Sequence, residues 1–148
     1  MLNDKRKWVK TAFHRYYANK ARLLQLKEDY ERVSIPGVGG GGGSGAHSCE
    51  NGVEKSVLHY LADRERFAKL IKDCENQIAI VEKTLHHFAV EEQAKAKRHA
   101  QYIRCRFIQR MSYTKAAVEC GLAERTSDFV LEEIMTVAYA IAEMEGYI

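Results

Sequence analysis

Apolar side chains recur at alternating intervals of four and three residues through the middle of this 148-residue chain. This spacing returns a side chain to the same face of an α-helix at every turn, whereas a β-strand alternates its faces every two residues. We therefore expect a helix over about residues 51–88 that packs along its length against another helix. The series is Val53, Val57, Tyr60, Arg64, Phe67, Ile71, Cys74, Ile78, Val81, Leu85 and Phe88, in which only Arg64 is not apolar.

A shorter series with the same spacing comes first and predicts a helix over about residues 3–33. Its one polar member is Asn19. On the packed face, Asn19 would fix the register of the helix pair, and on a curved helix it would face solvent; the spacing leaves both open. The series is Val9, Ala12, Tyr16, Asn19, Leu23, Leu26, Tyr30 and Val33.

A glycine-rich run at residues 37–45 separates the two series and follows Pro36, the only proline of the chain. Proline disfavours helix in the residue before it, and glycine keeps maximal backbone freedom, so residues 34–50 are predicted to be a flexible linker. A phosphate-binding loop would need a preceding strand and a Gly-Lys-Ser/Thr sequence, and neither is present. The simplest arrangement is an antiparallel, coiled-coil-like helical hairpin over residues 1–93.

Two helices alone bury little apolar surface, so we expect the hairpin either to self-associate into a homodimer or a higher homo-oligomer or to be packed by the remainder of the chain. The residues of the hairpin that we expect to bind a partner are Ile71, Ile78 and Leu85.

Charge is sorted along the chain. Residues 94–125 hold eight Lys and Arg against two Asp and Glu, whereas residues 126–148 hold five acidic residues and no Lys or Arg. The charged N-terminus lacks the apolar region of a secretory signal, and no run of about 18 apolar residues could span a membrane. The four cysteines form no Cys-x-x-Cys pair, which is typical of reduced thiols in a cytoplasmic protein.

The segment after the basic helix expected at residues 90–110 has the pattern of a helix-turn-helix. Ser112 is a suitable N-cap for a short helix that ends at Cys120, and Gly121 can supply the left-handed turn after it. A longer helix is expected from about Glu124, and the small side chain of Ala117 would let the two helices cross closely. We therefore predict an all-α fold in which the hairpin is followed by a basic helix and a helix-turn-helix in residues 94–148.

The charged hairpin with its Pro/Gly/Ser-rich loop, the basic helix and the segment Arg106-Phe107-Ile108-Gln109-Arg110-Met111-Ser112-Tyr113 together resemble the RinA/ArpU-type regulators of late transcription in phages of Gram-positive bacteria. The C-terminal part of that family is similar to region 4 of bacterial sigma factors. The resemblance covers about residues 17–138. It implies a transcription regulator of the bacterial host cytoplasm that binds promoter DNA, with RNA polymerase as a further partner.

This sequence departs from the family pattern in the helix-turn-helix. Ser127 stands where a branched apolar residue is usual, and Ala123 stands where a serine usually opens the second helix. Glu124 and Asp128 would place carboxylates near DNA phosphates. The side chains expected to contact double-stranded DNA are Arg104, Arg106, Arg110, Lys115, Arg125 and Thr126.

The alternative function is a non-enzymatic interaction protein whose degenerate helix-turn-helix binds RNA polymerase or a host protein. The last helix has a wide apolar face, and Ile134 and Ile141 on that face would contact the partner. The same face could instead be buried and close the core, and the pattern leaves both open. RNA binding by the basic helix is a weaker possibility, because no recognised RNA module is present.

No constellation of side chains predicts catalysis, a metal site or a cofactor. His86 and His87 are consecutive and point to different helix faces, and a zinc site built on His47 and Cys49 would lack the usual ligand spacing. Cys105 lies between Arg104 and Arg106, which could favour its thiolate, but no base stands near it in the sequence.

Overall fold

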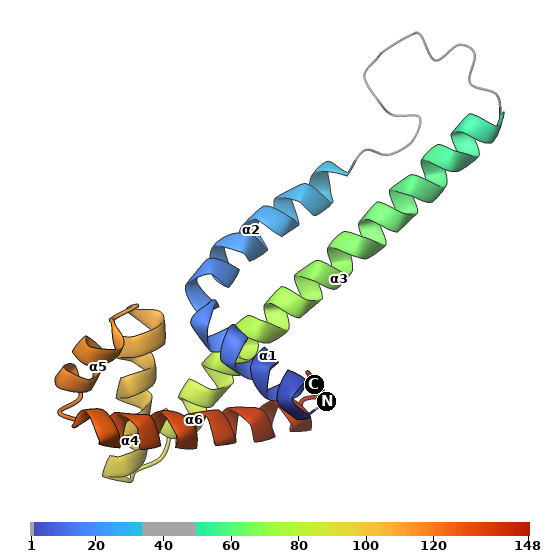
Figure 1. The fold of residues 1–148 in the computed structure, drawn as a ribbon. Helices are drawn as coiled ribbons and strands as arrows, with labels where there is room; N and C mark the ends of the chain where they lie inside the picture. Colours follow the sequence, from blue (N-terminus) through green and yellow to red (C-terminus); the bar gives the residue numbers. More distant parts are fainter. Residues whose placement is uncertain (1, 34–49) are drawn as a thin grey trace. The chain divides into compact units, whose positions relative to one another are not determined.

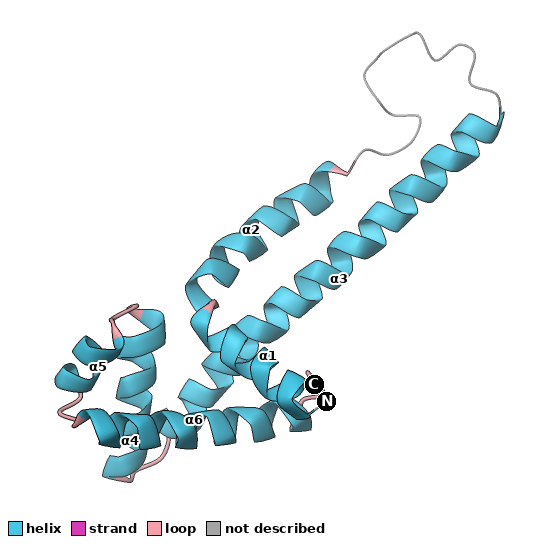
Figure 2. Ribbon diagram, viewed as in Figure 1, coloured by secondary structure: helices cyan, strands magenta, loops and turns pink. Residues whose placement is uncertain are grey.

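The computed structural model describes residues 2–33 and 50–148, and all regular structure in these ranges is helical (Figures 1 and 2). The predicted all-α fold is confirmed. The predicted linker at residues 34–50 lies outside the described residues except for Glu50. None of the described helices is both long and apolar enough to cross a bilayer. The elements are α1 (Leu2–His14), α2 (Tyr16–Arg32), α3 (Glu50–Ala89), α4 (Ala94–Ile103), the π-helical segment η2 (Arg104–Ile108), α5 (Tyr113–Glu119) and α6 (Glu124–Met144).

Contacts divide the chain into two compact units. Unit 1 contains the residues up to Lys20 together with Glu75–Ile148, and unit 2 contains Ala21–Cys74. The sequence-based division at residue 93 stays a prediction. Unit 1 joins the two ends of the chain because α1 packs on α6.

Unit 2 pairs most of α2 with the first part of α3, and its polar centre is Arg64. The Arg64 guanidinium lies 4.2 Å from the ring centroid of Tyr30 and donates hydrogen bonds to the hydroxyls of Tyr30 and Tyr60, at 2.5 and 2.8 Å. A cation over an aromatic face is attracted by the ring quadrupole. This explains how one arginine fits a series that is otherwise apolar.

Unit 1 has the larger core, built where α1 packs on α6. Val9, Ala12 and Phe13 of α1 are buried, as are Ile134 and Ala138 of α6. The Phe13 ring also meets the Phe107 ring of η2 edge-on, with centroids 5.1 Å apart. In Figure 1, α4, η2 and α5 lie at the N-terminal end of α6, and α1 lies along its C-terminal half.

The helix predicted over residues 3–33 is in fact interrupted at Arg15. The two parts have different packing partners: α1 contacts α6, whereas α2 begins with side chains that reach α3. The Tyr16 hydroxyl donates to Glu82 at 2.9 Å, and the Asn19 amide donates to Gln77 at 2.8 Å. Asn19 is only 3% exposed, so of the two positions left open for it, the packed face is the observed one.

The long helix predicted over residues 51–88 is confirmed as α3, but the basic helix predicted over residues 90–110 is shorter and irregular. It begins at Ala94, widens into a π-helix at Arg104, and stops where Arg110 adopts a left-handed backbone with φ of 59°. A π-helical turn changes the direction of the side chains that follow it. The basic residues of this region therefore do not share one helix face.

Candidate nucleic-acid interface

The predicted helix-turn-helix is present as α5, a tight turn and α6. The Ser112 hydroxyl accepts a hydrogen bond from the Lys115 backbone N–H at 3.2 Å and caps α5. Gly121 has φ of 65°, and the Leu122 N–H closes the turn by donating to the Ala117 carbonyl at 2.8 Å. Ala117 is buried, as the close helix crossing requires.

A hydroxyl network fastens the first turn of α6 to α5. The Tyr113 hydroxyl donates to the Asp128 carboxylate at 2.6 Å and lies 2.9 Å from the Ser127 hydroxyl. Ser127 is fully buried, and its hydroxyl also lies 2.8 Å from the Glu124 carbonyl. The hydrogen bond to Asp128 raises the pKa of Tyr113. The departure at Ser127 thus has a structural role, and the exposed Asp128 carboxylate already accepts a hydrogen bond from Tyr113.

The outward face of the first two turns of α6 carries a cation, a hydroxyl and an aromatic ring. Arg125 and Thr126 are exposed, and Phe129 is 59% exposed. Ile134 points into the core on the opposite side, and Val130 is buried beside Thr126. Side chains three and four residues apart lie on one helix face, so Arg125, Thr126 and Phe129 form a continuous surface.

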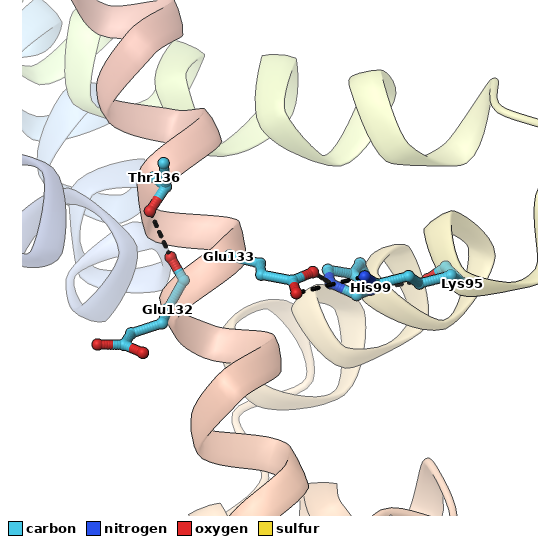
Figure 3. Close-up of polar contacts among 5 residues, drawn as sticks. All are labelled: Lys95, His99, Glu132, Glu133 and Thr136. Atoms are coloured by element: carbon cyan, nitrogen blue, oxygen red, sulfur yellow. Dashed lines mark hydrogen bonds and ion pairs between the residues drawn. The ribbon is translucent and has the colours of Figure 1, made fainter.

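A buried histidine joins α4 to α6 beside this surface (Figure 3). His99 is 2% exposed; its Nδ1 donates to the Lys95 carbonyl at 2.7 Å, and its Nε2 lies 2.7 Å from the Glu133 carboxylate. The Lys95 ammonium is 3.3 Å from the other oxygen of Glu133. The hydrogen bond from His99 and the nearby Lys95 lower the pKa of Glu133.

This cluster predicts a pH dependence of stability. Because the pKa of Glu133 is lower in the folded chain than its ordinary 4.5, its carboxylate stabilises the fold above that pH, and the contribution is lost as pH falls through the folded pKa. Between about pH 5 and about pH 3, the free energy of unfolding should therefore fall more in the wild type than in Glu133→Gln. Urea unfolding followed by circular dichroism measures both.

The matched control is Glu132→Gln, because the Glu132 carboxylate points away from His99 (Figure 3). This variant should keep the acid sensitivity of the wild type. Equal acid sensitivity of the wild type and Glu133→Gln would contradict the role given to the carboxylate.

The six side chains predicted to contact DNA differ in how far they are exposed to solvent. Arg104, Arg110, Lys115, Arg125 and Thr126 are exposed, and the Arg110 guanidinium stacks 4.6 Å from the Tyr17 ring centroid. Arg125 and Thr126 share the first turn of α6. Arg104 lies on η2, Arg110 follows η2, and Lys115 lies on α5.

Arg106 is the exception among the six. It is half-buried, its Nε is buried without a hydrogen-bond partner, and its Nη1 donates to the Met111 carbonyl at 3.4 Å. The π-helical turn directs it into the protein, so the structure does not support the prediction that it contacts DNA.

Lys95 and Arg98 lie near the outward face of α6 and were not among the predicted contacts. Together with His99, Thr126, Phe129, Val130 and Glu133 they line a hollow of about 320 Å³. The basic side chains of α4 identify a basic helix, but only the packing of α4 on α6 brings Lys95 and Arg98 to Thr126.

The residues predicted to bind a protein partner are largely internal. Ile134 is 0% exposed and Ile78 is also buried, whereas Ile71, Leu85 and Ile141 are half-buried. Of the two positions left open for the last helix, the one that closes the core is therefore observed for α6. Ile134 presents no surface to a second protein.

Cys105 is buried, and Cys120 is half-buried beside it. Burial and the neighbouring Cys105 thiol raise the pKa of Cys120 from 9.0 to about 11, which keeps it protonated at neutral pH. His47 and Cys49 lie outside the described residues. Among the described side chains of residues 3–33 and 55–148, no three His, Cys, Asp or Glu are grouped to hold a metal ion.

Comparison of the chain with protein-family models, curated proteins and solved structures found no match.

Proposed function

We propose that the protein is a DNA-binding transcription regulator, of the phage late-gene kind that the sequence resembles, and that α6 is its recognition helix. The observation that carries the proposal is the exposed face of Arg125, Thr126 and Phe129, held by the turn at Gly121 and by the Tyr113 network. An α-helix fits the major groove, where base edges present distinct donor and acceptor patterns.

The roles of the side chains follow from their chemistry. Arg125 can donate two hydrogen bonds to guanine, and Thr126 can contact either a polar base edge or a methyl group. Arg104, Arg110 and Lys115 are exposed cations suited to phosphates, which set affinity and position without reading sequence. The Asp128 carboxylate accepts a hydrogen bond from Tyr113, and the Glu133 carboxylate pairs with His99. These contacts reduce the repulsion that the two carboxylates would exert on DNA.

The protein would act as a homodimer or a higher homo-oligomer in the host cytoplasm. The small core of unit 2 supports this. In its described part, Leu26 and Cys74 are the only buried apolar residues, whereas Leu24, Leu58 and Leu61 are more than half exposed. A unit with so small a core gains stability from a second copy.

Selection of duplexes from a random pool by the full chain tests this function. We expect enrichment of a preferred sequence that binds about a thousandfold more tightly than random duplex of the same length, at the lower end of the range for specific binding. Recovery of only random sequences would contradict specific DNA recognition.

A second candidate is the interaction protein that binds RNA polymerase or a host protein. It is favoured by Val118 on α5, which is apolar and 72% exposed. This candidate predicts a stable oligomer without affinity for duplex DNA, so mass in solution measured together with duplex binding separates the two.

A further inference from the structure

The hollow between α4 and α6 is a feature that the proposed function does not itself require. Its volume is about 320 Å³, and the exposed ring of Phe129 forms one wall, with Thr126 and Val130 beside it. Arg98 and Lys95 line it from α4. The hollow therefore places an apolar surface directly next to two cations.

The polar groups around the hollow differ in whether they already form an ion pair or hydrogen bond within the protein. His99 and the Lys95 ammonium are both paired with Glu133, at 2.7 and 3.3 Å. Arg98 is exposed and makes no ion pair within the described part of the chain. Arg98 is thus the cation that can accept an anionic ligand without first breaking an internal contact.

The apolar wall lies on the recognition face itself. Phe129 is four residues after Arg125 and three after Thr126, so the three side chains face the same way. In the major groove, the one apolar group on a base edge is the 5-methyl of thymine, which aromatic and threonine methyl contacts recognise. The phosphates that flank the groove require cations beside such a contact.

We propose that Phe129 and Thr126 read the 5-methyl group of one thymine, while Arg98 binds an adjacent phosphate. This inference rests on the proposed function and adds the chemical class of base that the site selects. Phe129 and Thr126 are then specificity-determining residues, and Arg98 is a positioning contact with the backbone.

The test uses the full chain and the duplex obtained by selection, with each thymine replaced in turn by uracil, which lacks only the methyl group. At one thymine, the wild type should lose about fourfold in affinity, which is the effect of burying one methyl group. Phe129→Ala should lower this ratio toward one, because only the Thr126 methyl contact then remains. The matched control, Val118→Ala, removes an exposed apolar side chain of α5 and should keep the fourfold ratio.

Arg98→Gln separates the phosphate contact from the methyl contact. It should weaken binding to the thymine and uracil duplexes by the same factor and so keep the ratio of the two affinities. The slope of the logarithm of affinity against the logarithm of salt concentration should become shallower by about one.

The outcomes distinguish this inference from the function on which it rests. Duplex binding with no position sensitive to uracil overturns thymine reading and leaves DNA binding intact; the exposed Phe129 ring would then serve a protein partner. A fourfold ratio that persists in Phe129→Ala assigns the methyl contact elsewhere and also overturns the inference. Absence of duplex binding in the wild type overturns the proposed function itself.

Discussion

Replacing Ile134 by aspartate is expected to unfold unit 1. Ile134 is 0% exposed in the core that α6 forms with α1, so the substitution places an unpaired carboxylate among apolar side chains. Such a change costs several kcal/mol, a large part of the roughly 5–15 kcal/mol that stabilises a typical domain. Urea unfolding followed by circular dichroism should show a loss of at least about 3 kcal/mol or no folded baseline at all.

Thr136→Asp is the matched control for this prediction, because it adds the same charge to an exposed position of the same helix. Its stability should stay within about 0.5 kcal/mol of the wild type. If Ile134→Asp stayed as stable as Thr136→Asp and lost only the binding of another protein, the apolar face of α6 would be a partner surface and the described core would be wrong.

Arg125→Ala and Lys115→Ala are expected to weaken DNA binding in different ways. Arg125 is assigned to a base edge, so its loss should cost about 1–3 kcal/mol on the preferred duplex and reduce the preference for that duplex over others. Lys115 is assigned to a phosphate, so its loss should weaken binding to every duplex by a similar factor. Fluorescence anisotropy with the preferred duplex and with three single-base variants of it measures both effects.

Both side chains are exposed, so neither substitution should change the thermal unfolding midpoint by more than a few degrees. Equal losses on all duplexes for Arg125→Ala would make Arg125 a second phosphate contact. Unchanged binding by both variants would remove α5 and the start of α6 from the DNA interface.

The elements that the sequence predicts well are those fixed by local spacing. The alternating intervals from Val53 to Phe88 place α3 within one residue of its observed ends. Ser112 and Gly121 fix the start of α5 and the turn after it, because capping and left-handed backbone depend on the residue itself. Both features are independent of what packs against them.

The features that the sequence does not predict are those fixed by distant contacts. The break at Arg15 arises because α1 and α2 pack on different helices, and the π-helical turn that directs Arg106 inward leaves no clear pattern. Ser127 looks like a defect of the helix-turn-helix until Tyr113 is found next to it. The hollow beside Phe129 likewise needs α4 and α6 to meet.

Each of the two apolar series has one polar member, and the sequence does not predict the partner of either. The spacing places Asn19 and Arg64 within the apolar series, but it does not identify the groups that form hydrogen bonds with them. Gln77 and Tyr30 do so, and they lie 58 and 34 residues away in the chain. Only the register of the paired helices brings these groups together.

The salt dependence of duplex binding by the wild type tests the central claim most directly. If Arg104, Arg110 and Lys115 each neutralise one phosphate, the logarithm of the affinity should fall linearly with the logarithm of salt concentration, with a slope of about −2.7, or about −3.6 with the phosphate contact inferred for Arg98. Between about 50 and 200 mM salt these slopes correspond to losses of roughly fortyfold and roughly 150-fold. Absence of duplex binding at about 50 mM salt, or an affinity that does not change with salt, would contradict DNA recognition by this protein.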